Sequence, residues 1–572
     1  MNMNQDPRSI YTPELWLKNY RAGHGAHLDA PPMSLLDLFD AARRQGEERP
    51  ALLYFDRALS YRQLDEMSDA LAAFLIERGF VAGHRLAVYL QNMPQFVIAV
   101  LAAWKAGGIV VPISPMNQER EVNNILVDCR PHALICLDSL YDDILSRDDE
   151  VRREGILVIS TSAHFLDVRN DPRVLPDPAL SSRPRACIDL ADVLADVPAA
   201  RRPLSKVHRP RPDDLAYLVY TSGTTGVPKA ALITHHNASV NARSIAAWHD
   251  FPTPAGPVLA MAPMFHVTGL VGHMALAWTL AAPLILMYRF EPAVVIDAIR
   301  AHRPAFTVGA ITAYNALIHH PNATADLFDS FHALVSGGAA IPPSVIEDIR
   351  TKTGRYVHNG YGLTETSAGV ICVPFGATAP VDRVSGALSI GVPTFDVHAW
   401  IADDAGAPVP IGQPGEIVIS GPCIAGGYWN KPEESKASMR PDGFRTGDIG
   451  FVDANGWFYL IDRKKDMINA SGYKVWPREV EDVLVSHPAV YEAAVIGVPD
   501  AYRGESVCAV ISLHPGVPFD LENLKAWCRE RMAVYKRPRE YVILDALPKT
   551  ASGKVLKREL RAMAAERATR AK

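Results

Sequence analysis

The sequence has little of what marks a nucleic-acid-binding or exported protein. Its 58 Lys and Arg residues stand against 63 Asp and Glu residues, a net charge of -5, so no basic excess is available for a nucleic-acid partner. The seven cysteines are an odd number and form no Cys-x-x-Cys pair, which argues against a zinc ribbon and a disulfide framework. We therefore expect a cytoplasmic protein with no nucleic-acid partner.

Long apolar runs are also scarce. The first residues, Met1 to Trp16, carry charged side chains and no apolar core, which argues against a secretory signal. One uncharged stretch, Leu270 to Met287, is nearly long enough to span a bilayer, but it contains His273 and is divided by Pro283. A proline ends or kinks a helix, so we expect a helix followed by a short buried strand rather than a membrane span.

The most informative segment is Tyr220 to Lys229, which follows an apolar run suited to a buried strand. Glycines allow backbone N–H groups to converge on one anion, hydroxyls add donors, and a lysine supplies positive charge. The residues that provide these groups are Thr221, Ser222, Gly223, Thr224, Thr225, Gly226 and Lys229. This composition and its place after a strand predict a polyphosphate-binding loop.

A P-loop and an ordinary surface loop are the two other interpretations of this segment. A P-loop has four residues between its glycines and a Lys-Ser or Lys-Thr directly afterwards. Here only two residues separate Gly223 from Gly226, and Val227 and Pro228 precede the lysine, so the Walker spacing is not met. An ordinary surface loop rich in Ser, Thr and Gly is the remaining alternative.

The length and apolar content predict several packed units of mixed helix and strand. A chain of 572 residues with 48% hydrophobic residues is too long for one core. Short apolar runs alternate with helical patterns, which predicts a parallel sheet. The strands expected in the first 340 residues are Leu86–Leu90, Ile109–Pro112, Ala133–Leu137, Val258–Ala262, Leu284–Met287, Ala305–Val308 and Ala333–Ser336.

The second half of the chain changes character. Glycine-spaced strands from Ser389 to Ser420 predict a smaller antiparallel subdomain. The charged cluster Asp462 to Asp466 is typical of a domain boundary, and the last hundred residues alternate helix and strand on a small scale. Between Ser181 and Pro212 we expect an exposed connection without regular structure.

Four further loops are candidate ligand-binding segments. Ser336 to Ala340 has only small side chains, so a flat ligand could lie against its backbone. Gly360 to Thr366 offers an aromatic ring, a hydroxyl and a carboxylate. Phe444 to Asp448 ends in a carboxylate suited to a ribose, and Pro548 to Lys554 holds two lysines.

In order and spacing, the stretches at 220–229, 361–365, 446–448, 462–466 and 548–554 resemble the signature motifs of the adenylate-forming superfamily. This superfamily includes acyl-CoA synthetases, amino-acid adenylation domains and luciferases. The match runs from about Leu35 to Leu560. The resemblance implies an α/β protein with a large N-terminal adenylation domain, residues 1–463, built of α/β subdomains and a small β-barrel-like subdomain. A small mobile α+β lid, residues 464–572, would complete it.

The resemblance also implies roles for individual residues, with ATP and CoA as co-substrates and Mg²⁺ as the metal. Besides the phosphate loop, the ATP contacts implied are Thr364 for phosphate, Glu365 for Mg²⁺, Asp448 and Arg463 for ribose, and Gly338, Ala339, Asn359 and Tyr361 for adenine. The lid would supply the catalytic Lys554 and the hinge Lys465. It would also carry Gly472 and Lys474 in a loop that moves toward the thiol tunnel.

The function expected from the resemblance is an AMP-forming acyl-CoA synthetase. Amino-acid-activating relatives have an aspartate where this chain has His266, and an ammonium group buried without a carboxylate is costly. A plain carboxylic acid is therefore favoured, with His266 gating a pocket lined by small residues. We expect a medium- or long-chain fatty acid. An aryl acid, transfer to a carrier protein, a homodimer and peripheral membrane contact are left open.

Overall fold

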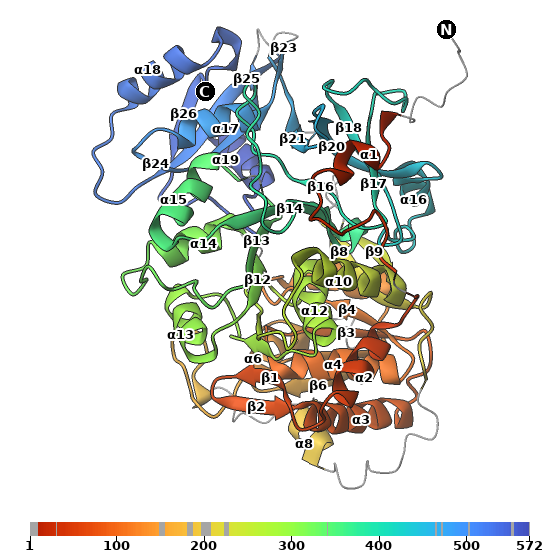
Figure 1. Cartoon of the computed structure of the whole chain (residues 1–572). Coiled ribbons are helices and arrows are strands. Elements are labelled where there is room, and N and C mark those ends of the chain that lie inside the picture. The colour runs from red at the N-terminus through yellow and green to blue at the C-terminus, as the bar shows by residue number, and fades with distance from the viewer. Residues whose placement is uncertain are drawn as a thin grey trace.

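The fold is taken from a computed structural model of the 572-residue chain (Figure 1). The residues that it describes are 10–29, 31–147, 155–179, 187–195, 208–221, 228–339, 341–463, 466–470, 473–500, 504–550 and 554–570.

The first of its sheets is a largely parallel one with helices on both faces. Its strand order is β7-β6-β5-β3-β4-β8-β9, and only β8 and β9 pair antiparallel. The parallel sheet predicted from the sequence is thus confirmed. Its elements are α3 (Tyr61–Glu77), β3 (Arg85–Tyr89), α4 (Pro94–Lys105), β4 (Ile109–Pro112), α5 (Glu119–Cys129), β5 (Ala133–Leu137), α6 (Asp138–Asp143), β6 (Leu157–Thr161), β7 (Ile188–Asp189), α8 (Leu190–Ala195), β8 (Leu215–Thr221) and β9 (Lys229–Thr234).

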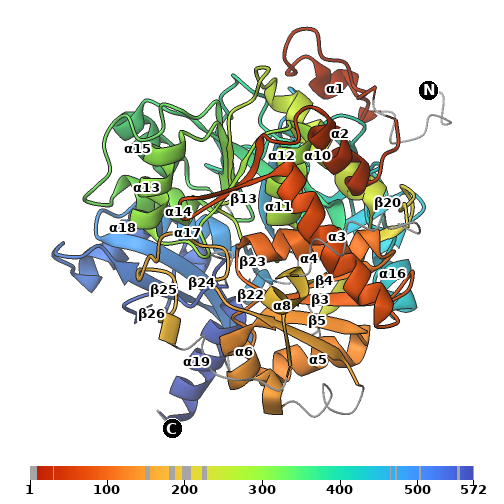
Figure 2. The same ribbon diagram turned by 90° about the horizontal axis from the view of Figure 1, so that it is seen from below.

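Side-chain alternation explains why these strands are apolar throughout. Leu86 and Val88 of β3 share a buried cluster with α4, whereas Ala87 and Tyr89 share another with α5. In Figure 2, α3 and α4 lie on one face of this sheet and α5 and α6 on the other. A strand covered on both faces has no polar side. The β7–α8 segment is a difference from expectation, because the connection between Ser181 and Pro212 was predicted to lack regular structure.

A second sheet continues the body with the strand order β16-β15-β14-β13-β12-β10-β11-β1-β2. Neighbouring strands from β14 to β1 run parallel, and antiparallel strands close both edges. The strands are β1 (Pro50–Tyr54), β2 (Arg57–Ser60), β10 (Val258–Leu259), β11 (Leu284–Leu286), β12 (Phe306–Gly309), β13 (Ala333–Gly337), β14 (Val357–Leu363), β15 (Ala368–Cys372) and β16 (Val392–Pro393). The helices are α2 (Leu35–Arg44), α10 (His235–His249), α13 (Pro292–His302), α14 (Ile311–Ile318) and α15 (Pro343–Thr353).

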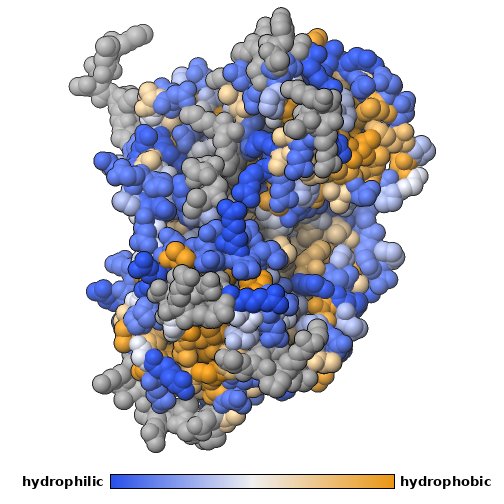
Figure 3. Space-filling model, turned by 180° about the vertical axis from the view of Figure 1, so that it is seen from behind, coloured by the Kyte–Doolittle hydropathy of each residue, from blue (hydrophilic) through white to orange (hydrophobic). Residues whose placement is uncertain are grey.

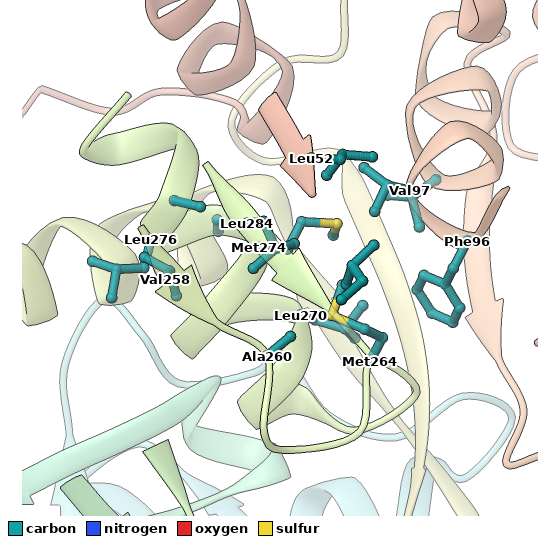
Figure 4. Close-up of a cluster of buried hydrophobic side chains, with 14 of the residues drawn as sticks. Leu52, Phe96, Val97, Val258, Ala260, Met264, Leu270, Met274, Leu276 and Leu284 are labelled. Atoms are coloured by element: carbon teal, nitrogen blue, oxygen red, sulfur yellow. The ribbon is translucent and has the colours of Figure 1, made fainter. Parts of the chain in front are cut away.

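The uncharged stretch near residue 280 is a continuous helix with a π-helical middle, followed by a strand, as predicted. It comprises α11 (Val267–Gly269), a π-helical turn η4 (Leu270–Ala275) and α12 (Leu276–Thr279), and then β11. Figure 4 shows Leu270, Met274 and Leu276 gathered with Phe96 of α4 in the core. No helix in the described part of the chain is long and apolar enough to cross a membrane.

A small antiparallel sheet and the N-terminal segment pack against each other. The sheet contains β17 (His398–Ala402), β18 (Gly415–Ser420), β19 (Met439–Arg440), β20 (Gly443–Val452) and β21 (Phe458–Arg463), with α16 (Pro432–Ser438) beside it. Trp16 of α1 (Glu14–Leu17) is buried against Phe458. The Tyr11 hydroxyl donates to the Val409 carbonyl at 2.6 Å, and the Asn19 amide donates to the Asn455 carbonyl at 2.6 Å.

The C-terminal lobe has its own sheet, ordered β23-β22-β25-β24 with β26 beside β25, and lies next to α15 in Figure 1. It is joined to the body where Arg478 donates through Nη1 to the Leu460 carbonyl at 2.8 Å and through its backbone N–H to Asp462 at 3.0 Å. The lobe contains β22 (Ile468–Ala470), β23 (Tyr473–Val475), α17 (Pro477–Val485), β24 (Val490–Asp500), β25 (Gly504–Leu513), α18 (Leu521–Arg531), η7 (Val534–Lys536), β26 (Glu540–Ile543) and α19 (Lys557–Arg570).

Sheet membership changes between Arg463, the end of β21, and Ile468, the start of β22. The predicted domain boundary at 463/464 falls in this interval and stays a prediction. Figure 3 shows the face opposite to Figure 1, which is mostly hydrophilic with separate apolar groups of residues.

Candidate functional site

Tyr361 and Asp448, predicted from separate motifs, are in direct contact. The Tyr361 hydroxyl on β14 donates to Asp448 Oδ2 on β20 at 2.7 Å, and Asp448 is 3% exposed. Asp448 is also the antiparallel pairing partner of Arg463 on β21; the structure describes the backbone of Arg463 but not its side chain. Three strands therefore bring the predicted ribose and adenine residues together.

The backbone around Asp448 is fixed by its neighbours. The Asp448 N–H donates to Thr446 Oγ1 at 3.1 Å, and that hydroxyl donates to the Ile417 carbonyl on β18 at 2.7 Å. Gly447 has a φ of +71°, in the left-handed region that favours glycine. Gly447 and Asp448 therefore lie within β20 and not in the loop that we predicted, and the φ of Gly447 explains why a glycine precedes this carboxylate.

The predicted adenine slot lies at the adjacent ends of β13 and β14. Ser336 pairs with Asn359, and Gly337 with Gly360. A Cβ on Gly337 would come within 2.7 Å of the Gly360 carbonyl oxygen, so only glycine allows this close approach. The Asn359 amide donates to the Ser389 carbonyl at 3.0 Å. Gly338 and Ala339 follow directly in the chain.

The motif from Gly360 to Thr366 is more regular than the loop we predicted. β14 extends to Leu363 because its end pairs with Ala368 of β15, and Thr364–Thr366 then form a 3₁₀ turn, η5. The Thr366 hydroxyl donates to the Ala368 carbonyl at 2.7 Å. This turn holds Thr364 half-buried and Glu365 8% exposed.

Glu365 is held by a residue that the sequence analysis missed. The Tyr428 hydroxyl donates to Glu365 Oε1 at 2.7 Å. Lys229 Nζ lies over the face of the Tyr428 ring, 5.5 Å from the ring centroid. Burial and the Glu365 charge raise the pKa of Tyr428, so the phenol keeps its proton and acts as a donor. The only available signal was the Gly426-Gly427-Tyr428-Trp429 stretch, an aromatic pair after two glycines.

Only the base of the predicted phosphate loop is within the described residues. Thr221 pairs with Lys229 across β8 and β9, and the Thr221 hydroxyl donates to the Lys229 carbonyl at 3.4 Å. Ser222, Gly223, Thr224, Thr225 and Gly226 lie outside the described residues, as do the predicted hinge Lys465 and Gly472, while of Lys474 the backbone alone is described.

His266 begins the α11 helix and is oriented by it. Its Nδ1 accepts a hydrogen bond from the Thr268 N–H at 3.3 Å. Because an amide N–H can only donate, Nδ1 carries no proton, and the neutral ring has its proton on Nε2. The pKa of His266 is lowered to about 4, first by burial and then by the positive charge of Lys554.

The effect of Lys554 on His266 shows that the C-terminal lobe presents this lysine to the body. Lys554 is fixed at the base of its loop, where its N–H donates to Thr550 Oγ1 at 3.1 Å and the Thr550 N–H donates to its carbonyl at 2.7 Å. The predicted catalytic lysine and the predicted acyl-pocket residue therefore lie within electrostatic reach of each other.

The predicted acyl-pocket wall is only partly suited to that role. Gly272 lies against Val308, whose Cγ1 would be 3.1 Å from a Cβ at this glycine. Tyr314 is fully buried and donates its hydroxyl to the Val335 carbonyl at 2.7 Å, so it supports β13. His273, not assigned a role from the sequence, accepts the Val308 N–H through Nε2 at 3.2 Å, and burial lowers its pKa to about 3. The remaining expected wall residues are Val271, Ala310, Gly337, Gly338, Ala368 and Gly369.

The donor set fits Mg²⁺ rather than a protein-caged metal. Within the described residues no group of three or more His, Cys, Asp or Glu side chains could hold a metal ion. Glu365 supplies a single carboxylate close to Lys229 of the phosphate loop. Mg²⁺ is commonly bound by one or two carboxylates with water and substrate phosphates, which this arrangement allows.

Comparison with protein families identifies the chain. A model described as AMP-binding enzyme matches residues 38–429. The chain belongs to the AMP-binding enzyme family. A model described as AMP-binding enzyme C-terminal domain matches residues 479–554, so the predicted boundary at 463/464 lies between the two matched ranges. The resemblance to the adenylate-forming superfamily and the predicted fold class are thereby confirmed.

Individual relatives of this family are similar over nearly the whole chain. A long-chain-fatty-acid–CoA ligase from Bacillus subtilis (strain 168) is 36% identical over 558 residues, covering 95% of this chain and 97% of that protein. A feruloyl-CoA synthase from Amycolatopsis sp is 32% identical over 520 residues, covering 91% and 96%. The structure of the anthranilate CoA ligase AuaEII in complex with anthranoyl-AMP superimposes with a TM-score of 0.83 at 25% identity, covering 95% and 99%.

Proposed function

We propose that this protein is an AMP-forming acyl-CoA synthetase that converts a medium- or long-chain fatty acid, ATP and CoA into acyl-CoA, AMP and pyrophosphate. The observation that carries the proposal is the 2.7 Å hydrogen bond from Tyr361 to Asp448, which brings two expected nucleotide-binding motifs from distant parts of the chain together. In support, the charge of Lys554, the lysine expected to act on the α-phosphate, lowers the pKa of His266, the residue expected at the acyl pocket. Similarity over 95% of the chain to a long-chain-fatty-acid–CoA ligase supports the same conclusion.

ATP would be bound by the elements that meet at the ends of β13, β14 and β20. Asp448 would accept hydrogen bonds from the ribose hydroxyls, and Arg463 would donate to them. The adenine would be enclosed by Tyr361, Asn359, Gly338 and Ala339. The phosphate loop and Thr364 would hold the phosphates. Mg²⁺, held by Glu365, would offset phosphate charge when bound.

The first half-reaction requires two anions to approach. A carboxylate is a weak nucleophile toward an anionic α-phosphate, and Lys554 would reduce their repulsion and stabilise the charge of the pentavalent transition state. One carboxylate oxygen forms a bond to phosphorus as the bond to pyrophosphate breaks. The products of this step are the acyl adenylate and free pyrophosphate.

The second half-reaction requires Lys554 to leave. Rotation of the C-terminal lobe about Lys465 would withdraw Lys554 and bring Gly472 and Lys474 toward the thiol tunnel. The CoA sulfur then bonds to the acyl carbon, and AMP departs with the electrons of the broken anhydride bond. A single lobe could in this way serve both reactions.

His266 favours an uncharged acyl group at the pocket entrance. With a pKa of about 4 it is neutral at pH 7 and offers no negative charge to a substrate ammonium. An amino acid would therefore bury its ammonium without a counter-charge, at a cost of about 2 kcal/mol or more. Most of the expected wall residues are small and uncharged, which suits an apolar acyl chain.

The test is a substrate panel with the purified protein. ATP- and CoA-dependent thioester formation is measured with fatty acids of increasing length, cinnamates and benzoates, together with AMP and pyrophosphate release. We expect one pyrophosphate and one AMP per thioester, with the highest kcat/KM for fatty acids. Turnover of aryl acids alone would replace the fatty-acid proposal by an aryl-acid–CoA ligase, an alternative favoured by the feruloyl-CoA synthase relative.

A carrier-protein loading enzyme is distinguished in the same assay. It would release pyrophosphate with the preferred acid but would form little acyl-CoA from free CoA. Supplying a phosphopantetheine-bearing carrier protein in place of CoA would then restore product formation. The expected result for this chain is efficient transfer to free CoA.

A further inference from the structure

Tyr428 connects two parts of the site that come from distant segments of the chain. Its hydroxyl donates to Glu365 Oε1 at 2.7 Å, and its ring lies 5.5 Å from Lys229 Nζ. We propose that Tyr428 is a positioning residue for the adenylation reaction, holding the Glu365 carboxylate in place for Mg²⁺ and supporting the Lys229 ammonium near the phosphates. The inference rests on the proposed function, because the metal role of Glu365 belongs to it.

The hydrogen bond restricts what Glu365 can do. A carboxylate has two oxygens, and the phenol occupies Oε1, which leaves Oε2 for a metal ion. At 8% exposure the carboxylate has little water to replace a lost partner, and hydrogen bonds to charged groups are stronger than neutral ones. Without the phenol, Glu365 would have to be fixed by the metal itself, which weakens metal binding.

The ring of Tyr428 has a second role that is separable from its hydroxyl. A lysine ammonium within about 6 Å of an aromatic centroid is attracted to the ring face. Lys229 follows the phosphate loop directly, so the ring would limit where this ammonium can go. Removing only the hydroxyl should leave this contact, whereas removing the ring should abolish it.

Tyr428 is itself rigidly placed, as a positioning residue must be. Its N–H donates to Ser435 Oγ at 2.8 Å, and it bridges to Ala231 of β9. The next residue, Trp429, donates its N–H to the Ala230 carbonyl at 2.9 Å. The strand that ends the phosphate loop is therefore the support on which Tyr428 rests.

The experiment measures metal dependence of nucleotide binding rather than turnover alone. Calorimetry with α,β-methylene-ATP is carried out over a series of Mg²⁺ concentrations for the wild type and five variants. These are Tyr428→Phe, Tyr428→Leu, Glu365→Gln, the double variant Tyr428→Phe/Glu365→Gln, and Tyr459→Phe. The last is the matched control, since the hydroxyl of Tyr459 on β21 also donates to a carboxylate, that of Asp453, at 3.3 Å. Thermal melting confirms that each variant is folded.

For Tyr428→Phe we expect the Mg²⁺ concentration at half-maximal binding to rise about tenfold, with metal-free binding unchanged. Tyr428→Leu should show the same rise and, in addition, about threefold weaker metal-free binding, because Lys229 loses its ring contact. Tyr459→Phe should match the wild type. In Glu365→Gln, adding Tyr428→Phe should cause no further change, since the carboxylate that the phenol holds is gone.

Two failures are distinguishable. If Glu365→Gln loses Mg²⁺ dependence but Tyr428→Phe retains the wild-type dependence, or if the two substitutions act additively, the positioning role of Tyr428 is wrong. If the wild type forms no acyl adenylate from any acid, the proposed function fails, whichever way Tyr428 behaves.

Discussion

Replacing Lys554 by alanine should separate the two half-reactions. The charge of Lys554 reaches His266 in the present arrangement of the lobes, which is the arrangement expected for adenylation. Two opposite charges about 4 Å apart interact by about 4 kcal/mol at an effective dielectric constant of about 20. Loss of that interaction in the transition state corresponds to a decrease of roughly a thousandfold in the rate of acyl-adenylate formation.

The assay measures each half-reaction by itself. Adenylation is followed by exchange of labelled pyrophosphate into ATP, and thioester formation by adding synthetic acyl adenylate and CoA. Lys554→Ala should lose the first activity and retain the second within a fewfold. The control is Lys525→Ala, which removes a lysine of α18 that pairs with Glu522 at 2.8 Å within the same lobe, and it should leave both activities intact.

A second readout tests the geometry without catalysis. Because the Lys554 charge lowers the pKa of His266, the substitution should raise that pKa, which NMR titration of the imidazole can follow. Equal loss of both half-reactions would mean that Lys554 has a structural role. An unchanged His266 pKa would refute the proximity on which the argument depends.

Three further predictions concern the lobe contact, pH and the core. Arg478→Met removes the hydrogen bond to the Leu460 carbonyl, and a hydrogen bond of a charged group contributes about 1.5–3 kcal/mol. The rate of pyrophosphate exchange should therefore fall roughly tenfold or more, and the rate of transfer from synthetic acyl adenylate should fall less. Burial lowers the pKa of His249 to about 3. The contribution of the neutral imidazole to the free energy of unfolding is therefore complete above about pH 6.5 and falls by about 1.4 kcal/mol for each pH unit below that value. In urea titrations, His249→Phe should lose less stability in acid than the wild type. Leu276→Ala should lower the unfolding free energy by about 2–5 kcal/mol in urea titrations, because Leu276 is fully buried in the cluster of Figure 4.

Elements set by continuous burial were predictable from the sequence. β4 and β5 match the predicted ranges at both ends, because β4 starts directly after two glycines and β5 is an apolar run between His132 and Asp138. The segment from Gly360 was predicted to be a loop, whereas β14 extends to Leu363. Its last residues pair with β15, and pairing between strands is not visible in a local pattern.

In the candidate site, too, single residues were predictable from the sequence, whereas their contacts with distant residues were not. Motif residues such as Asp448 and Tyr361 could be selected from sequence, but their 2.7 Å contact joins positions 87 residues apart. Tyr428 was missed because its partner Glu365 is 63 residues away, and nothing near Tyr428 in the chain signals a carboxylate. Roles that depend on a distant partner become apparent only when the strands are assembled.

The packing of residues 10–29 onto the small antiparallel sheet has a consequence for biosynthesis. Tyr11 meets Val409 across 398 residues, so the beginning of the chain leaves the ribosome long before its binding surface has been translated. At roughly 5–20 residues per second the wait is about 20–80 s, during which Trp16 has no partner to cover it. A nascent chain halted before Val409 should therefore be protease-sensitive at its amino-terminal end, and synthesis past that point should protect it.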